Sequence, residues 1–334
     1  MKTRRLGRSD LHVSQLCLGT ASFGWRIDEE TSHALLDGFR EAGGNFIQTC
    51  GAAADGTAVA ESYLGRWAQS RGVPRGDIIV ASRCDVMDDR EGGDIFRTAS
   101  SIRRRCEQTL RELGMRYLDL LVLEWAESLA MDEVLLAAET LVRAGLVRHF
   151  AVGGFPAWRV MEWLGHSARR NLCRIEAMQI ELSLISNAAV NLEALALARS
   201  HRLGLVARAP LAGGLLADRA EAGRHGAEAA HEAMAALRRI AAAHGAGPGQ
   251  AAVAWVLAHA DVSSVQIMPH TMARLQEHIA ATSIGLSFSE LRRLDWLWKA
   301  TVRPSFDDDD ESDVSPDIPR LEALAPEASE NLNV

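Results

Sequence analysis

The sequence predicts an α/β fold, a closed parallel (β/α)8 TIM barrel, for three reasons. Short apolar runs alternate with amphipathic helical windows eight times along most of the 334 residues. The runs are continuous rather than alternating, as in parallel strands buried on both faces. No GxGxxG motif follows the first run, which argues against a doubly wound dinucleotide-binding sheet. Eight strand–helix units in succession are the pattern of a (β/α)8 barrel.

Each element follows from its periodicity. Strands are predicted where Val, Ile and Leu form short runs. In chain order these are residues 15–19, 45–48, 77–82, 118–123, 147–152, 177–181, 204–207 and 264–268. Helices are predicted where apolar residues recur on one face, as Leu35 and Phe39 do in the first window. These windows are residues 29–42, 59–70, 95–113, 132–144, 158–167, 192–201, 230–244, 250–259, 272–281 and 289–299.

The composition changes after residue 300. Residues 301–334 are rich in Asp, Glu, Ser and Pro, and residues 307–311 read DDDDE. Such a segment predicts a flexible tail rather than a packed element. We therefore expect two parts, a barrel domain over residues 1–300 and an acidic tail over residues 301–334. The tail would provide solubility, or alternatively act as a lid or bind a protein partner.

Composition also excludes classes of function. The net charge of −8 with no basic stripe argues against a nucleic-acid partner. No apolar run reaches the ~20 residues of a membrane span, and no signal sequence opens the chain, so we expect a cytoplasmic protein without a membrane partner. The five cysteines lack CxxC or zinc spacing, which favours reduced thiols and predicts no metal site. Lys2 and Lys299, the two lysines, lie far from any central pocket.

Several segments resemble the aldo-keto reductase superfamily over roughly residues 1–300. The matching positions are residues 6–11, 13–14, 18–20, 44–47, Glu61, 64–65, 113–114, 117–121, Gln179, 210–216 and 254–257. The resemblance implies a (β/α)8 barrel that reduces carbonyl compounds with NADPH. It also implies a catalytic tetrad of Asp, Tyr, Lys and His, in which the tyrosine gives a proton to the carbonyl.

By this resemblance the four tetrad positions are Gln48, Ala53, Arg83 and Glu124, so all four residues differ from the family pattern. The Glu124 change has a parallel in steroid 5β-reductases, which carry a glutamate there. Ala53 is the most serious change, because a methyl group cannot donate a proton. The resemblance therefore predicts a degenerate site that has lost carbonyl reduction.

The cofactor positions differ as well. The Ser–Asn pair that holds the nicotinamide amide corresponds to Gly153 and Gly154, and the stacking tyrosine corresponds to Arg208. Residues 268–273 after the last strand lack the basic residue that would bind a 2′-phosphate. Gln179 remains, as a vestigial cofactor-binding residue. We therefore expect no cofactor, with NADPH as the disfavoured alternative.

Polar residues at the carboxyl ends of the predicted strands form the candidate site. Glu124 is predicted as a general acid/base, and Arg83 as the cation that binds a substrate oxygen. The alternative is that the two form a structural ion pair. The predicted substrate contacts are Gln48, Cys50, Asp85, Trp25, Trp125, Glu181 and Arg208. Cys50 could instead be a nucleophile or a small packing residue.

Three functions are compatible with these residues. The favoured hypothesis is a non-redox acid/base enzyme (a lyase, isomerase or cyclase) that acts on a small polar organic molecule. A non-catalytic binding or scaffold protein is the second. The third is a divergent NADPH-dependent oxidoreductase, with Glu124 or water as its proton donor. A titration with NADPH and NADH would separate the third hypothesis from the other two.

Overall fold

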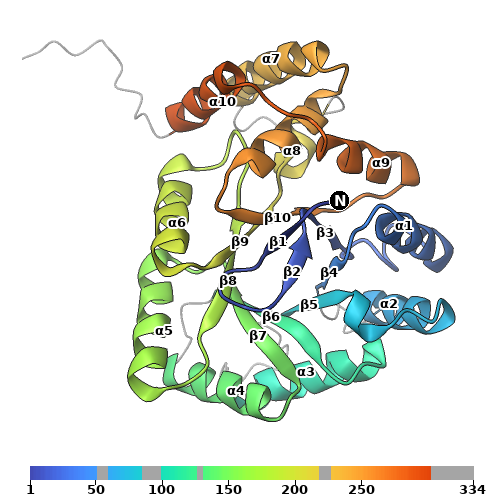
Figure 1. Cartoon of the computed structure of the whole chain (residues 1–334), viewed down its shortest axis with the longest axis vertical. Helices are drawn as coiled ribbons and strands as arrows, with labels where there is room; N and C mark the ends of the chain where they lie inside the picture. The colour runs from blue at the N-terminus through green and yellow to red at the C-terminus, as the bar shows by residue number, and fades with distance from the viewer. Residues whose placement is uncertain (51–58, 85–98, 126–130, 218–226, 302–334) are drawn as a thin grey trace, which may run out of the picture. The chain divides into compact units, whose positions relative to one another are not determined.

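Within the residues that the structure describes, eight parallel strands close into a barrel, as predicted (Figure 1). The computed structural model describes residues 1–50, 59–84, 99–125, 131–217 and 227–301. The barrel strands are β3 (Leu16–Gly19), β4 (Phe46–Thr49), β5 (Ile79–Cys84), β6 (Leu118–Glu124), β7 (Val147–Gly153), β8 (Ile175–Glu181), β9 (Gly204–Arg208) and β10 (Val262–Ile267). Consecutive strands pair in parallel, and β10 pairs with β3 to close the barrel.

The helices surround this barrel (Figure 1). They are α1 (Glu29–Glu41), α2 (Val59–Ser70), α3 (Ala99–Leu113), α4 (Met131–Arg143), α5 (Ala157–Arg170), α6 (Ala188–His201), α7 (Ala227–Ala243), α8 (Pro248–Ala258), α9 (Met272–Ala281) and α10 (Phe288–Ala300). Short 3-10 helices span Arg75–Asp77 and Ala212–Gly214.

Most predicted boundaries agree closely with the structure. Each predicted strand is present, and its ends differ by no more than two residues. Helix α6 differs by four residues at its start, because it begins at Ala188 rather than at residue 192. The side chain of Asn187 caps this helix by accepting hydrogen bonds from the amides of Ala189 and Val190. A good N-cap therefore extends the helix ahead of its apolar periodicity.

Apolar side chains form two cores, one on each face of the sheet. The larger core lies between the strands and the helices, with fully buried Trp67, Trp163 and Phe150 among its members. The smaller core fills the barrel interior, and its strand residues are Cys17, Phe46, Ile79, Ala81, Leu120, Val122, Ala151, Ala177 and Val206. Because side chains alternate across a strand, this list identifies which positions face the lumen.

A hairpin of β1 (Thr3–Arg5) and β2 (His12–Ser14) lies across the amino end of the barrel (Figure 1). Leu6, Leu11 and Val13 are at most 2% exposed and belong to the interior core. The hairpin therefore closes the amino end with apolar side chains. The carboxyl end is left as the place for a ligand.

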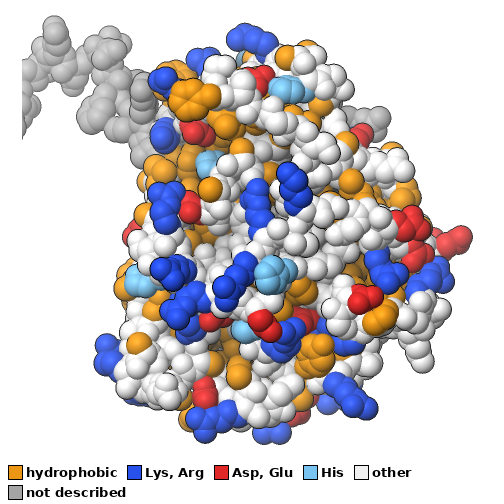
Figure 2. Space-filling model, viewed as in Figure 1, with side chains coloured by type: hydrophobic (Ala, Val, Ile, Leu, Met, Phe, Trp, Pro, Cys, Tyr) orange, Lys and Arg blue, Asp and Glu red, His pale blue; other side chains and the backbone are white. Residues whose placement is uncertain are grey.

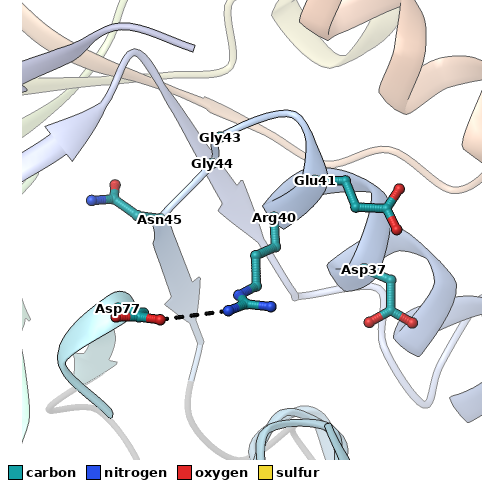
Figure 3. Close-up of a pocket in the computed structure, with 7 residues that line it drawn as sticks. All are labelled: Asp37, Arg40, Glu41, Gly43, Gly44, Asn45 and Asp77. Atoms are coloured by element: carbon teal, nitrogen blue, oxygen red, sulfur yellow. Dashed lines mark hydrogen bonds and ion pairs between the residues drawn. The ribbon is translucent and has the colours of Figure 1, made fainter. Parts of the chain in front are cut away.

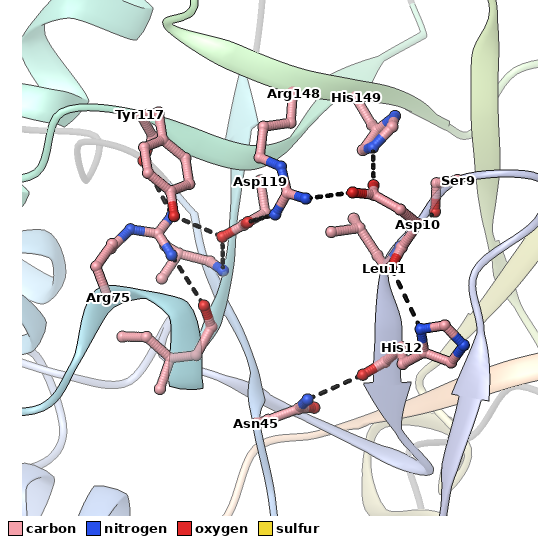
Figure 4. A network of polar contacts seen from close by, with 12 residues as sticks. Ser9, Asp10, Leu11, His12, Asn45, Arg75, Tyr117, Asp119, Arg148 and His149 are labelled. Atoms are coloured by element: carbon pink, nitrogen blue, oxygen red, sulfur yellow. Dashed lines mark hydrogen bonds and ion pairs between the residues drawn. The ribbon is translucent and has the colours of Figure 1, made fainter.

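A charged network fixes the hairpin to the strands (Figure 4). The carboxylate of buried Asp119 accepts hydrogen bonds of 2.6 Å from both Arg75 and Arg148. Arg148 also donates to Asp10 at 2.6 Å, and His149 lies 2.7 Å from the same carboxylate. The hydrogen bond to His149 lowers the pKa of Asp10; burial opposes this shift, and the charge of Arg148 reinforces it. The network is a structural latch at the amino end.

Basic side chains gather on this amino-end face, although the chain is acidic overall (Figure 2). Many of them occupy the last turns of helices, among them Arg40, Arg143, Arg169, Arg170 and Arg199. Cations at a helix carboxyl terminus are stabilised by the helix dipole. The basic face therefore follows from helix polarity.

The expected absence of a membrane span and the expected acidic tail are tested only in part. Of the described residues, no helix is long and apolar enough to cross a membrane. The acidic tail falls outside the described residues from position 302 onward, so the two-part division of the chain stays a prediction.

Candidate active site

A ring of eight residues caps the interior core at the carboxyl end of the barrel. Seven of them follow a lumen-facing core residue by two positions, and therefore face the same way. We call this set the polar ring; it consists of Gly19, Gln48, Arg83, Glu124, Gly153, Gln179, Arg208 and, from β10, Gln266. The ring brings together predicted residues from strands that are far apart in the sequence.

One half of the ring is a set of amides. Gln179 donates to the side-chain oxygen of Gln48 at 2.8 Å, and Gln48 donates back to Gln179 at 3.2 Å. Both side chains are at most 4% exposed. The same amide nitrogen of Gln179 also donates to the side-chain oxygen of Gln266, at an N···O distance of 3.5 Å. The side-chain amide of Gln179 thus donates to Gln48 and Gln266. Its side-chain oxygen accepts one hydrogen bond from Gln48 and keeps a second lone pair for another donor.

The other half of the ring is charged. Oε1 of Glu124 lies 3.9 Å from Nε of Arg83 and 3.6 Å from Nη1 of Arg208. Both separations are longer than a hydrogen bond. Arg208 also lies 3.2 Å from Glu181, whose side chain is 65% exposed. The predicted Arg83–Glu124 pair therefore exists, and Arg208 joins it as a second cation.

Gly153 makes room for the Glu124 carboxylate. A Cβ at position 153 would lie 2.6 Å from Oε1 of Glu124, closer than non-bonded atoms approach. Gly154 has a positive φ of 67°, and its amide lies 3.4 Å from the backbone oxygen of Gln179. A side chain at position 153 would therefore displace the Glu124 carboxylate, whereas glycine at position 154 is favoured by its backbone conformation.

An aromatic wall adjoins Glu124. The ring of Trp125 packs edge-on against Phe155 at 5.2 Å and Trp158 at 6.3 Å between centroids. The guanidinium of Arg159 lies over both tryptophans, at 5.3 and 4.7 Å, and is held by Glu162. Trp158 remains 61% exposed. Trp125 was predicted as a substrate contact, and that role stays a prediction.

Other predicted residues are less well defined. Trp25 is 72% exposed, and its described contact is with Arg26, whose guanidinium lies 4.3 Å from the ring. Cys50 is half-buried directly after β4. Asp85 and Ala53 lie outside the described residues. The roles predicted for these residues, and for the members of the ring, stay predictions.

Sequence reasoning missed three features of the site. Gln266 was not selected, although it is a polar residue within a predicted strand, which was the available signal. The sequence held no local signal that a side chain at position 153 would clash with Glu124, or that Trp158 lies beside Trp125. Both contacts depend on how separate elements pack together.

No group of three or more His, Cys, Asp or Glu side chains among the described residues is arranged to hold a metal ion. A pocket of about 380 Å³ opens beside the amino end of β4 (Figure 3). Its lining includes Asp37, Glu41 and Asp77, and Arg40 pairs with Asp77 across it at 3.5 Å. This pocket lies at the opposite end of the barrel from the polar ring.

Comparisons with known proteins agree with this architecture. The model of the aldo/keto reductase family matches residues 15–299. The uncharacterised oxidoreductase YrpG of Bacillus subtilis is 30% identical over 310 residues, which cover 88% of this chain and 95% of the relative. Protein tas of Escherichia coli is 26% identical over 91% of this chain and 100% of the relative. An NADP(+) aryl-alcohol dehydrogenase of Phanerodontia chrysosporium is 31% identical over 45% of this chain and 43% of the relative.

These findings correct the favoured prediction. The expectation of a non-redox lyase, isomerase or cyclase was wrong, because the matching family is that of the aldo/keto reductases, and several relatives are named as oxidoreductases, reductases or dehydrogenases. That expectation took substitutions at single positions as evidence for a different reaction. The inferred loss of the tetrad stays a prediction. A family match over most of the folded chain, and a relative aligned over nearly its whole length, show that the chain belongs to the aldo/keto reductase family.

Proposed function

We propose that the chain is an NADPH-dependent oxidoreductase that interconverts a carbonyl compound and its alcohol. The family and the oxidoreductase names of relatives support this proposal. So does the name of norsolorinic acid reductase from Emericella nidulans, a relative matched over 45% of this chain. The observation that carries the proposal is the polar ring, in which amides adjoin a guanidinium–carboxylate cluster at the ligand-binding end of the barrel.

The residues present fit a nicotinamide. Its carboxamide carries N–H donors, and buried Gln179 offers an oxygen lone pair that its partners Gln48 and Gln266 do not use. Gly153 and Gly154 have no side chains, so the backbone beside Gln179 stays open to a nicotinamide ring. Gln179 would therefore hold the carboxamide, with Gln48 fixing the orientation of the Gln179 amide. When bound, the reduced nicotinamide supplies a hydride.

The charged residues would act on the carbonyl group. Arg83 is a permanent cation, so it would stabilise negative charge that develops on the carbonyl oxygen, but it is a poor proton donor. Glu124, whose side chain is 19% exposed, can exchange protons with solvent and pass one to that oxygen. This division of roles replaces the donor tyrosine that the family pattern would place at position 53.

A binding and turnover experiment tests the proposal. We expect calorimetry to show NADPH binding, and absorbance at the nicotinamide band to show NADPH consumption with aromatic or aliphatic aldehydes. Gln179→Leu should weaken NADPH binding about tenfold, because one hydrogen bond is lost. Glu124→Gln should lower kcat about 100-fold and remove an ionisation from the pH profile.

The matched control is Glu41→Gln, since Glu41 is an exposed carboxylate at the opposite end of the barrel. Its kcat should equal that of the parent chain. Absence of NADPH and NADH binding at millimolar concentrations would rule out the proposed function. An unchanged kcat in Glu124→Gln would remove Glu124 from the mechanism.

A further inference from the structure

Arg8 lies in the turn of the β1–β2 hairpin, at the amino end of the barrel. Its backbone is held on both sides: its amide donates to the carboxylate of Glu176 at 3.2 Å, and its carbonyl oxygen accepts from Arg5 at 2.7 Å. Its side chain is exposed and forms an ion pair with none of the described carboxylates. The turn therefore presents a permanent cation from a fixed backbone.

Two more arginines adjoin this turn. The guanidinium of Arg174 lies 3.5 Å from Glu176, the carboxylate that also holds the Arg8 amide. The backbone oxygen of Arg202 would lie 3.2 Å from a Cβ at Gly7, so this residue packs against the turn. Arg202 is exposed and, like Arg8, pairs with none of the described carboxylates. We call Arg8, Arg174 and Arg202 the arginine cluster.

The arginine cluster carries more positive than negative charge. Of the described carboxylates, Glu176 is the one that pairs with the cluster, and it is 8% exposed. Burial lowers the pKa of Arg174; Glu176 opposes this shift, and the charge of Arg8 adds to it. Arg8 and Arg174 thus repel each other. Three cations beside one carboxylate leave an excess of two positive charges for a ligand to balance.

The positions of these arginines are unusual for charges that only stabilise the fold. Arg202 is the C-cap of α6 and has a left-handed backbone with a φ of 52°. Glycine and asparagine are favoured there, and the C-cap of α5 is Asn171 with the same φ. Arg8 lies in a hairpin turn, so the helix dipole that accounts for basic residues in last turns does not account for it. Strained or uncompensated placement of this kind is typical of binding sites.

We infer that the arginine cluster binds a phosphate group of a soluble ligand, at the end of the barrel opposite the polar ring. Guanidinium forks match the geometry of phosphate oxygens, and a phosphate dianion balances the two excess charges. Exposed Arg8 and Arg202 contact the phosphate, while half-buried Arg174 contributes its charge from behind them. The site is separate from the proposed active site and does not depend on its reaction.

Calorimetry with inorganic phosphate, at a pH where it is a dianion, tests the inference. The parent chain should bind phosphate, with an affinity that falls as NaCl is added. Arg8→Gln should weaken binding about tenfold, because a charge-assisted hydrogen bond is lost. Arg8→Lys should keep part of the affinity, since lysine retains the charge but not the planar fork.

Arg202→Asn separates binding from stability. Asparagine suits the left-handed backbone at this position, so the Tm without phosphate should be kept or raised. Phosphate affinity should nevertheless fall about tenfold, because the cation is removed. A variant that keeps both its Tm and its phosphate affinity would show that Arg202 does not contact the ligand, and the proposed site would be wrong.

Two variants serve as controls. Arg143 lies in the last turn of α4, is 74% exposed and pairs with Glu139, so Arg143→Gln should keep the phosphate affinity of the parent chain. Gln179→Leu changes the polar ring and should also keep it. If phosphate affinity falls in Gln179→Leu but not in Arg8→Gln, phosphate binds at the polar ring and the inference is overturned.

Sedimentation with vesicles that contain phosphatidic acid distinguishes a soluble phosphate from a lipid headgroup. We expect the chain to stay in the supernatant while calorimetry shows phosphate binding. Sedimentation that depends on Arg8, without binding of inorganic phosphate, would assign the site to a lipid and overturn the inference of a soluble ligand. The NADPH affinity of Arg8→Gln should equal that of the parent chain in every case.

Discussion

Gly153 shows how one residue depends on another across two strands. The Glu124 carboxylate occupies the space where a side chain at position 153 would begin, at 2.6 Å from an added Cβ. The position of the Glu124 carboxylate on β6 therefore depends on the glycine at position 153 on β7. In the same ring, Gly19 leaves space for Gln266, whose amide would be 3.0 Å from an added Cβ.

Gly153→Ala tests this dependence. The new methyl group should displace the Glu124 carboxylate from Arg83 and Arg208, and kcat should fall by about tenfold or more. The control Gly285→Ala adds a methyl group in open space and should not change kcat. A Gly153→Ala variant with the kcat of the parent chain would show that the position of Glu124 is unimportant for turnover.

Substitution of Asp119 is expected to have a large effect on stability. It is 1% exposed, accepts hydrogen bonds from Arg75 and Arg148, and also accepts one from the amide of Val80 at 2.9 Å. Asp119→Ala leaves these donors without their partner, and we expect a loss of about 3–5 kcal/mol in the free energy of unfolding, measured with urea. Asp77→Ala removes an exposed ion pair with Arg40 and should cost less than about 1 kcal/mol. Equal losses of unfolding free energy in the two variants would show that the network around Asp119 does not stabilise the fold more than an exposed ion pair does.

At the scale of elements, the helices cover the outside of the sheet and also pack against one another, as α7 and α10 do with α8. Helix α9 packs against α1 and α8, and its Leu275 is fully buried. Burial lowers the pKa of His278 on this helix from 6.5 to about 4; Glu277 opposes the shift and Arg274 adds to it. Half-buried His278 in the folded chain is therefore neutral at pH 7.

The lowered pKa of His278 predicts a pH dependence of stability. Below pH 6.5 the unfolded chain binds a proton at His278, whereas the folded chain binds it only near pH 4. Stability should therefore fall as the pH falls through this window, by on the order of 1–2 kcal/mol at pH 5. His278→Gln should reduce the difference between urea midpoints at pH 7 and pH 5. His231→Gln, at an exposed position of α7, should not. If the difference between the urea midpoints at pH 7 and pH 5 is unchanged in His278→Gln, other groups cause the pH dependence of stability.

At the scale of the whole molecule, the described residues up to Thr301 belong to one compact unit, which contains the complete barrel. The hydroxyl of Thr301 donates a hydrogen bond to the backbone oxygen of Ser186 and accepts one from the amide of Ala188. This residue thus ties the end of α10 to the start of α6.

Two truncations test whether the barrel is sufficient for stability and for NADPH binding. A chain of residues 1–302 should keep the Tm of the full chain and the same affinity for NADPH. A chain of residues 1–297 also loses Trp298, which is 1% exposed and packs 5.5 Å from Trp255. Removal of such a side chain costs about 3–5 kcal/mol, so its Tm should fall by several degrees. A large decrease in Tm for the first truncation would show that the tail contributes to stability.

Local patterns in the sequence were enough to predict the architecture. Continuous apolar runs and one-sided helical windows are local properties, and eight alternations of them leave few arrangements other than a barrel. The same periodicity placed Arg83, Glu124 and Arg208 at strand ends. Residue-level resemblance to the aldo-keto reductases named the family, which the comparisons confirmed.

The tertiary structure alone decided how the site residues meet. Gln48 and Gln179 are separated by 131 positions, yet their amides pair because barrel closure brings β4 and β8 to opposite sides of one lumen. Arg208 reaches Glu124, and Gly153 admits the carboxylate, for the same reason. Such contacts depend on strand register and side-chain volume in three dimensions, which no window of sequence contains.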